Sequence, residues 1–419
     1  MSIKLRLTIM SFLQFFFFFA WLITIGTYCL NAKGWTFPQF GAIFSTLALA
    51  SLFMPALTGI IADKWLNAER LYGILHIVYG LILFYVPKVD DPGTLYYVIF
   101  GAMICYMPTI SLSNSIAYTI LKRDGFDVVK VFPSIRVWGT IGFIVAMWCT
   151  NLSGSKDNSN QFIIGAVGAI ILGIFSFTLP KCPPPKSIAK DAGFAEQMGL
   201  QAFKLFGNYK MALFFLFSML LGAALQLTNM YGDSFLTSFD KIEAFKDSFV
   251  VKYSTIILSI SQMSETLFIL TIPFFLKKFG IKKVMLFAML AWVLRFGLFA
   301  YGDPTAMGTV HIILSCIVYG MAFDFFNISG SLFVETSTDS SIRSSAQGLF
   351  MMMTNGVGAW LGSTVSGMVI GKYYINADGS SNWQGIWFAF AVYALVIAIL
   401  FAVLFKHKHV PEEVATVQH

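Results

Sequence analysis

The sequence predicts an all-α membrane protein with about twelve transmembrane helices in two six-helix bundles. Of the 419 residues, 57% are hydrophobic and only 12% are charged, and the mean hydropathy is +0.74. Soluble proteins carry about 25% charged residues, so the composition excludes soluble enzymes, nucleic-acid-binding proteins and disordered proteins. Apolar runs long enough to cross a bilayer, about 20 residues, recur along the chain, and a polar segment separates two sets of them.

These apolar runs give six spans on each side of the middle of the chain. The first run follows Lys4 and Arg6, but it is too long for a signal peptide and has no small-residue cleavage site. The expected spans are 5–30, 40–61, 71–86, 95–120, 131–152 and 162–179 in the first half, and 211–236, 249–276, 284–299, 310–334, 347–370 and 386–405 in the second.

The middle of the chain is predicted to be a linker between the two bundles. The segment from Pro180 to Lys210 contains three consecutive prolines and five lysines, a composition typical of a polar linker. We therefore expect four parts: an N-terminal six-helix bundle at 1–180, a cytoplasmic linker at 181–210, a C-terminal six-helix bundle at 211–405 and a cytoplasmic tail at 406–419.

The distribution of basic residues predicts the orientation. If both termini are cytoplasmic, 19 of the 28 Lys and Arg residues fall on inner segments and 7 on outer loops, while Arg136 and Arg295 lie within spans. This bias follows the positive-inside rule. It also accounts for the net charge of +7, so no nucleic-acid partner is needed. We expect a multi-pass protein of a bacterial inner membrane, in contact with lipid.

A weak internal repeat supports a duplicated transporter. The second helix of the first half is followed by a tight basic turn containing Gly59, Asp63 and Lys64, and the second helix of the second half is followed by Lys277–Lys283. The first turn resembles the loop of the major facilitator superfamily, which makes Gly59, Asp63 and Lys64 a candidate gating loop. The alternative is that this turn simply ends a helix.

Polar side chains within the spans mark a candidate substrate site. Ionisable and amide groups are costly in a bilayer and usually face a cavity or a partner. Several share one helical face at spacings of three or four residues. They are Arg136, Thr140 and Phe143 on the fifth span, Gln226 and Asn229 on the seventh, Gln262 and Glu265 on the eighth, and Tyr319 and Phe323, followed by Asp324, on the tenth.

The residue types favour a neutral, flat and hydroxyl-rich solute. Amides and a carboxylate can bind hydroxyl groups, and aromatic faces can stack on a planar ring. A single buried cation does not suit an anion, and the absence of clustered carboxylates or imidazoles in the sequence argues against a metal or another cofactor. Three alternatives stay open: the amides could join helices, the rings could be packing, and Glu265 with Arg136 could be a structural ion pair.

Transport against a gradient needs an energy source. Gly371-Lys372 is followed by Tyr373 rather than Ser or Thr, so the sequence has no phosphate-binding loop there. Glu265 and Asp324 are the candidate proton-coupling groups, with Arg136 as a modulating charge. We predict a transporter and not an enzyme, with no catalytic residues. A membrane enzyme acting on lipid, or an uncoupled facilitator or exporter of the same fold, are the alternatives.

Seven longer segments resemble one family, the bacterial nucleoside–proton symporters of the major facilitator superfamily, which includes a broad nucleoside permease and a xanthosine permease. The resemblance implies nucleoside import with protons and a monomer. It places the nucleoside site on the nine residues from Arg136 to Phe323 named above, and coupling or the conformational cycle on Asp324. The segments are MPALTGIIADKWL, FPSIRVWGTIGFI, SMLLGAALQLTNMYG, LSISQMSETLFILTIPFFL, LRFGLFAYGDP, VYGMAFDFFNISGSLFVE and SAQGLFMMMTNG.

One stretch departs from the family pattern. Phe15 to Phe19 are five consecutive phenylalanines, where related sequences tend to have Trp at 18 and Gly at 19. A phenylalanine at 19 fills space where helices approach closely. The run is compatible with natural variation and with an engineered change that favours one conformation.

Overall fold

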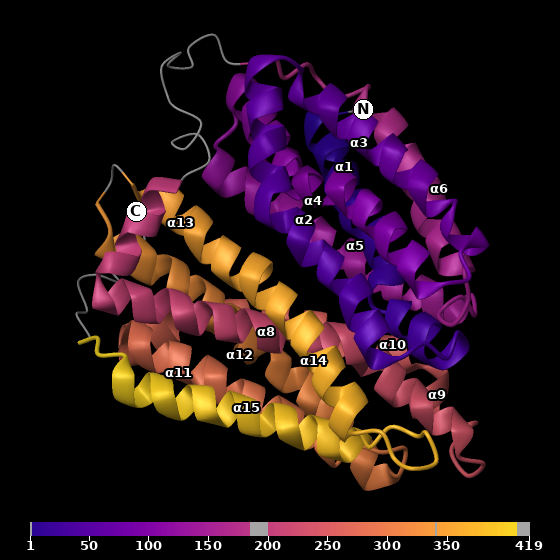
Figure 1. Ribbon diagram of the computed structural model, residues 1–419. Coiled ribbons are helices and arrows are strands. Elements are labelled where there is room, and N and C mark those ends of the chain that lie inside the picture. The colour runs from indigo at the N-terminus through magenta and orange to yellow at the C-terminus, as the bar shows by residue number, and fades with distance from the viewer. Residues whose placement is uncertain (1, 185–199, 340–341, 409–419) are drawn as a thin grey trace. The chain divides into compact units, whose positions relative to one another are not determined.

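The computed structural model describes residues 2–184, 200–339 and 342–408 and divides into two compact units, Met1–Met198 and Gly199–His419 (Figure 1). Both units are helical. The described residues contain one isolated β-bridge, between Ile375 and Ser381, and no β-strand. The division falls within the segment 181–210 for which the sequence predicts a linker.

The described residues of the first unit form six α-helices joined by shorter segments. Their starts are encoded locally: the Thr36 side chain accepts the backbone N–H of Gln39 and the Gln39 side chain accepts that of Thr36, which is a capping box. The elements are α1 (Ile3–Leu22), η1 (Thr27–Ala32), α2 (Phe37–Lys64), α3 (Ala68–Leu83), η2 (Val86–Lys88), α4 (Pro92–Arg123), α5 (Val128–Leu152) and α6 (Asn160–Ser176).

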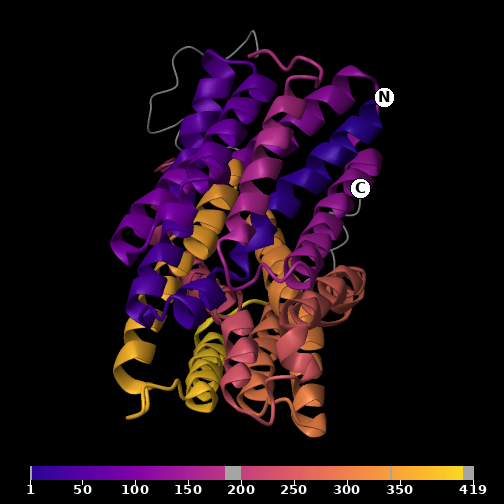
Figure 2. The same cartoon turned by 90° about the vertical axis from the view of Figure 1, so that its right-hand side faces the viewer.

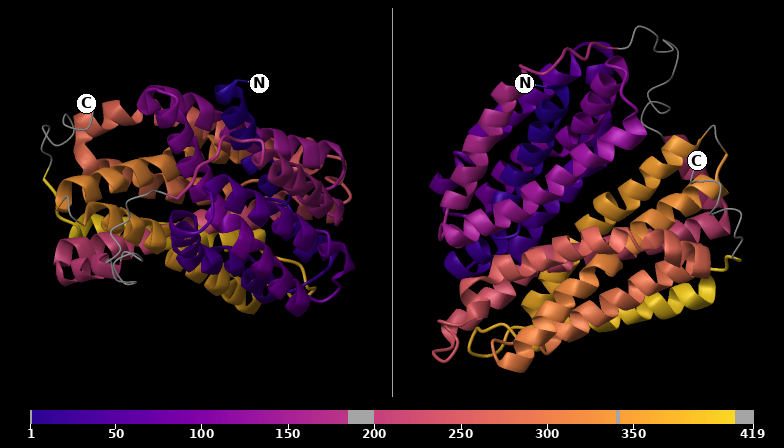
Figure 3. Two further views of the ribbon diagram at one scale, coloured as in Figure 1. Left: turned by 90° about the horizontal axis from the view of Figure 1, so that it is seen from above. Right: turned by 180° about the vertical axis from the view of Figure 1, so that it is seen from behind.

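The second unit has more interrupted helices, and Figure 2 and Figure 3 show the ribbon from other sides. Its elements are η3 (Leu200–Gly207), α8 (Tyr209–Ser238), η4 (Phe239–Lys241), α9 (Phe249–Lys252), α10 (Ser254–Ile269), α11 (Ile272–Ala300), α12 (Ala306–Ser337), α13 (Arg343–Met351), η5 (Met352–Gly358), α14 (Ala359–Tyr373) and α15 (Trp383–Leu404). The predicted all-α membrane class is confirmed.

Within the described residues, nine helical segments are long and apolar enough to cross a membrane, and all twelve predicted spans coincide with helical structure. Three predicted spans are not among these nine segments, because their helices are short or interrupted. The sixth is the 17-residue α6. The eighth is divided into α9, α10 and the start of α11, and the eleventh contains the π-helix η5.

The two predicted basic turns have different outcomes. In the second unit, Gly280 has φ 75° and ψ 168° within α11, so the chain turns inside Lys277–Lys283 as expected. In the first unit, α2 continues to Lys64, and the turn follows at Trp65. The prediction that Gly59, Asp63 and Lys64 form a loop is therefore wrong, because the backbone N–H of Trp65 still donates to the Ile61 carbonyl at 3.0 Å.

The helices pair in the same order within each unit, which supports the duplication. In the first unit α1 contacts α5 and α6, α3 contacts α4 and α6, and α2 contacts α4. In the second unit the equivalent helices repeat every pair: α8 contacts η5, α14 and α15, α11 contacts α12 and α15, and α10 contacts α12. Figure 3 shows α15, in yellow, alongside α11.

A buried polar network ties three helices of the first unit together. The Gln14 side chain on α1 donates to Thr109 Oγ1 at 2.9 Å and accepts from the Tyr72 hydroxyl at 2.5 Å, and Tyr106 donates to the Gln14 carbonyl at 2.9 Å. Gln14 is only 1% exposed. A satisfied polar network of this kind fixes the register of packed helices.

The parts expected between and after the bundles lie partly outside the described residues. Of the predicted linker 181–210, residues 185–199 are not among them, and Leu200–Gly207 form the helix η3. Of the predicted tail 406–419, residues 409–419 are not among them.

Candidate functional site

In the first unit, the three predicted site residues lie on one face of α5. Arg136, Thr140 and Phe143 are each partly buried. The Arg136 guanidinium lies over the ring of Phe15 on α1, 4.3 Å from the ring centroid, which is a cation–π contact. The structure therefore brings this triad together beside α1, as the spacing predicted.

The phenylalanine run accounts for the immediate surroundings of that triad. The ring of Phe19 is stacked on the ring of Phe143, with centroids 3.4 Å apart and an interplanar angle of 15°. Phe18 stacks on Tyr106 at 4.1 Å instead. Consecutive residues of one helix thus serve different contacts, and one face of Phe143 is covered by Phe19.

Helices α1 and α5 can be this close because α5 carries glycine where they meet. A Cβ atom on Gly142 would lie 2.3 Å from the Phe12 carbonyl oxygen, and one on Gly139 would lie 2.7 Å from the Phe15 ring. Neither space admits a side chain. The close contact places Phe15 and Phe19 against the polar stripe of α5.

In the second unit, the remaining predicted residues lie on α8, α10 and α12. Gln226, Asn229 and Glu265 are partly buried, and Gln262 is 5% exposed. The Gln262 Oε1 atom is buried without a hydrogen-bond partner in the described part of the chain. A buried amide oxygen without a partner is costly, so it marks a place where a ligand or water is expected.

Helices α10 and α12 touch through their backbones at Gly320. A Cβ atom there would lie 2.6 Å from the Ser264 carbonyl oxygen and 2.8 Å from the Glu265 nitrogen. The Ser264 hydroxyl also donates to the Ile317 carbonyl at 2.5 Å. This contact brings the Glu265 side of α10 next to the aromatic stripe of α12.

That stripe consists of Tyr319 and Phe323, whose rings are nearly parallel, at 5° with centroids 6.2 Å apart. Beside it, Asp324 is 7% exposed, and its Oδ2 atom has no hydrogen-bond partner among the described residues. Glu265 interacts electrostatically with both Tyr319 and Asp324. Two carboxyl groups and an aromatic wall thus gather on α10 and α12.

Arg295 on α11, which the sequence places within a span, lies behind this wall. It is 3% exposed, and its guanidinium lies 4.4 Å from the centroid of Tyr319. Nη1 donates to the Ser315 carbonyl at 2.9 Å. The cation–π contact fixes the Tyr319 ring from the side of α11, and no sequence spacing linked these two residues.

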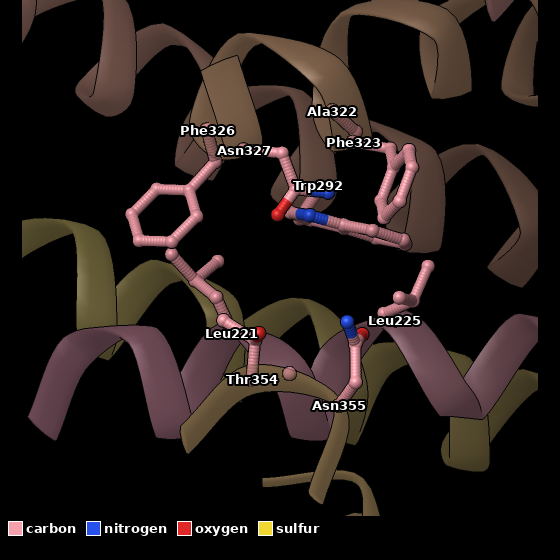
Figure 4. A pocket seen from close by; sticks show the side chains of 10 residues that line it. Leu221, Leu225, Trp292, Ala322, Phe323, Phe326, Asn327, Thr354 and Asn355 are labelled. Carbon is pink, nitrogen blue, oxygen red and sulfur yellow. The ribbon is translucent and has the colours of Figure 1, made fainter. Parts of the chain in front are cut away.

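A pocket of about 280 Å³, partly open, lies next to Phe323 in the second unit (Figure 4). Leu221 and Leu225 of α8, Trp292 of α11, Asn327 of α12 and Asn355 of η5 also line it. Of the nine predicted residues, the pocket includes Phe323 alone. Asn327 follows Phe323 by four residues, so extending the α12 stripe by one turn would have found it.

Comparison with known proteins decides the family. The model of the nucleoside H⁺ symporter family matches residues 1–410. The chain belongs to the nucleoside H⁺ symporter family. The predicted family and the prediction that the protein is a transporter and not an enzyme are thereby confirmed.

The sequences of individual relatives match this chain over its whole length. It is 52% identical to the xanthosine permease of Escherichia coli (strain K12) over 414 residues, covering 99% of this chain and 98% of that one. It is also 52% identical to the nucleoside permease NupG of the same strain over 421 residues, covering 100% of both chains. A crystal structure of the nucleoside transporter NupG superimposes with a TM-score of 0.92 at 51% identity, covering 97% of this chain and 100% of that one.

The symporter is therefore a multi-pass protein of the inner membrane with the major facilitator fold. The predicted class, family and membrane location are confirmed. The roles of the individual site residues, the orientation of the termini and the oligomeric state stay predictions.

Proposed function

We propose that this symporter imports nucleosides with protons by alternating access around a central site. One observation carries the proposal: a family match over nearly the whole chain coincides with partly buried amide, carboxyl and aromatic side chains on α8, α10 and α12. The relatives that match over their full length are named as permeases of nucleosides and of xanthosine.

The proposed substrate contacts follow from side-chain chemistry. Gln226, Asn229 and Gln262 offer carboxamides that both donate and accept hydrogen bonds, which suits ribose hydroxyls and a base edge. Phe143, Tyr319 and Phe323 offer ring faces for a planar base. Arg136 and Thr140 add donors from the first unit. Gln262 supports the assignment best, because its buried Oε1 lacks a partner in the described residues.

Proton coupling is assigned to Glu265 and Asp324, with Arg136 as the modulating cation. The two carboxyl groups interact electrostatically in a weakly solvated part of the second unit. Such a pair can take up one proton and release it when its surroundings change. One charge moving through 100 mV supplies about 2.3 kcal/mol, enough for roughly a 50-fold nucleoside gradient.

The transport cycle we propose rocks one bundle against the other. It uses the predicted bundles 1–180 and 211–405, a cytoplasmic linker at 181–210, and cytoplasmic termini including the tail 406–419. Gly59, Asp63 and Lys64 then belong to a cytoplasmic gate at the end of α2 rather than to a loop. The protein acts as a monomer in lipid, without a cofactor, a metal or a nucleic-acid partner.

Uptake of radiolabelled uridine tests the proposal. Bacterial cells lacking their own nucleoside permeases would express this chain, and uptake would be measured at pH 6 with and without a proton uncoupler. We expect accumulation above the outside concentration that the uncoupler abolishes. Uptake that only reaches the outside concentration and does not respond to the uncoupler would indicate a facilitator instead. If the cells took up no nucleoside at all, the proposed function would be refuted.

A further inference from the structure

The pocket beside Phe323 is a candidate binding compartment beyond the nine predicted contacts. It lies among α8, α12 and η5, with Trp292 of α11 along one side (Figure 4). Its volume of about 280 Å³ includes space open to solvent, so the enclosed part is well below the 300–1,000 Å³ typical of pockets that hold a whole small molecule. A pocket of this size suits one end of a ligand whose remainder lies elsewhere.

Two carboxamides face each other across this space. Figure 4 shows Asn327 pointing in from α12 and Asn355 pointing in from η5 on the opposite wall. The Asn327 side chain makes no hydrogen bond to any described residue, and among these residues the Asn355 amide makes only a 4.0 Å approach to Met351 Sδ. Both amides therefore have donors and acceptors available.

Local structure explains how Asn355 reaches that position. It lies in the π-helix η5, whose wider turn interrupts the regular helical spacing. A Cβ atom on Gly222 of α8 would lie 2.0 Å from the Thr354 carbonyl oxygen, so α8 and η5 are in backbone contact there. π-Helical turns are frequent at functional sites, and this one places the Asn355 side chain in the pocket lining.

The aromatic side of the pocket is continuous with the predicted site. The indole of Trp292 meets the ring of Tyr319 edge to face, with centroids 5.9 Å apart, and Tyr319 is parallel to Phe323. Phe323 belongs to both the predicted site and the pocket. A planar group stacked on this wall would present its edge to the two amides.

The chemistry of the lining selects one kind of ligand edge. The lining contains no charged side chain, which disfavours a phosphate or another ion. Each carboxamide has one accepting oxygen and two N–H donors. A heterocycle that carries a carbonyl next to a ring N–H, as the oxo-purines and uracil do, pairs its edge with such groups.

We propose that Asn327 and Asn355 bind the edge of the nucleobase and so determine which bases this symporter prefers. The inference rests on the proposed function, because it assumes that a nucleoside is the substrate. It adds two specificity residues on α12 and η5 that neither helical spacing nor family resemblance identified.

Paired substrates test it. Inosine has a carbonyl and a ring N–H on its base, whereas purine riboside lacks both. We would measure binding of each to the purified full-length protein, and uptake of each in cells, for the wild type and for Asn327→Ala and Asn355→Ala. Losing one net hydrogen bond of about 0.5–1.5 kcal/mol lowers affinity about 2- to 13-fold. We expect this loss for inosine and almost none for purine riboside.

Controls separate the possible failures. Asn376→Ala removes an amide from an exposed loop of the same unit, where it donates to Ser380, and should leave both substrates unchanged. Asn355→Gln and Asn327→Gln keep the amide but displace it, and they replace any alanine variant that does not fold. Equal losses for both substrates, an unchanged ratio, or a wild type without preference would overturn the inference. A wild type that binds neither nucleoside would instead refute the proposed function.

Discussion

Replacing Phe19 with alanine tests whether the stacked phenylalanine pair competes with the substrate. The rings of Phe19 and Phe143 are 3.4 Å apart between centroids and nearly parallel. That spacing leaves no room for a base between them. A nucleobase that stacks on this face of Phe143 must therefore displace Phe19 first.

The cost of that displacement sets the expected size of the effect. A stacked aromatic pair contributes about 0.5–1.5 kcal/mol beyond its area burial, and 1.4 kcal/mol corresponds to tenfold in affinity. Phe19→Ala should therefore tighten nucleoside binding about 2- to 13-fold, because the bound state no longer loses the pair. Isothermal titration of uridine into purified protein measures this directly.

Phe16→Ala is the matched control, since it removes a ring from the same helix whose contacts are with Phe12 and Phe17. It should leave affinity unchanged. Weaker binding in Phe19→Ala would mean that Phe19 is itself a wall of the site. Unchanged binding would mean that the pair stays closed during transport. Either result refutes the reasoning.

Three further predictions concern coupling, packing and reactivity. Glu265→Gln should abolish uridine accumulation driven by a pH gradient while keeping exchange of internal for external uridine, and accumulation at the wild-type level would exclude a coupling role. Gly320→Ala should lower the free energy of unfolding by about 1–3 kcal/mol, because its Cβ would lie 2.6 Å from the Ser264 carbonyl oxygen. Gly59→Ala is the control, because a Cβ there has nothing within 4 Å, and it should be neutral or slightly stabilising. Thermal melts measure both variants, and equal melting temperatures would contradict this prediction. Burial raises the pKa of Cys182 to about 11 from 9, so its thiolate fraction at pH 8 is about 100-fold below that of a free thiol. An alkylating reagent should therefore leave Cys182 unmodified in the folded protein, as mass spectrometry would measure. Rapid labelling would contradict this burial.

Composition and periodicity were enough for the class of protein and for most helices. The bilayer requires long apolar runs, so these runs mark the twelve expected spans without any knowledge of packing. The interruptions were not accessible in the same way. Gly280 turns the chain because it adopts a positive φ, whereas Gly59 remains in a helix, and the two glycines look alike in the sequence.

Stripes of polar residues were predictable for a related reason. Residues separated by three or four positions share a helical face, so Arg136, Thr140 and Phe143 could be grouped before any coordinates. Contacts between different helices do not follow from spacing. The stacking of Phe19 on Phe143 depends on the close approach of α1 and α5 that Gly139 and Gly142 allow, and the contact of Arg295 with Tyr319 depends on how α11 packs on α12.

One of the residues missed by the sequence, Asn355, lies where the helical repeat breaks. It is in a π-helix, where the spacing of 3.6 residues per turn does not hold. The same irregularity that hides Asn355 from periodicity brings its amide into the pocket opposite Asn327. In a membrane helix, an unpaired amide next to an aromatic wall is costly unless a ligand uses it. Interrupted helices of this symporter are therefore the places where specificity residues should be sought first.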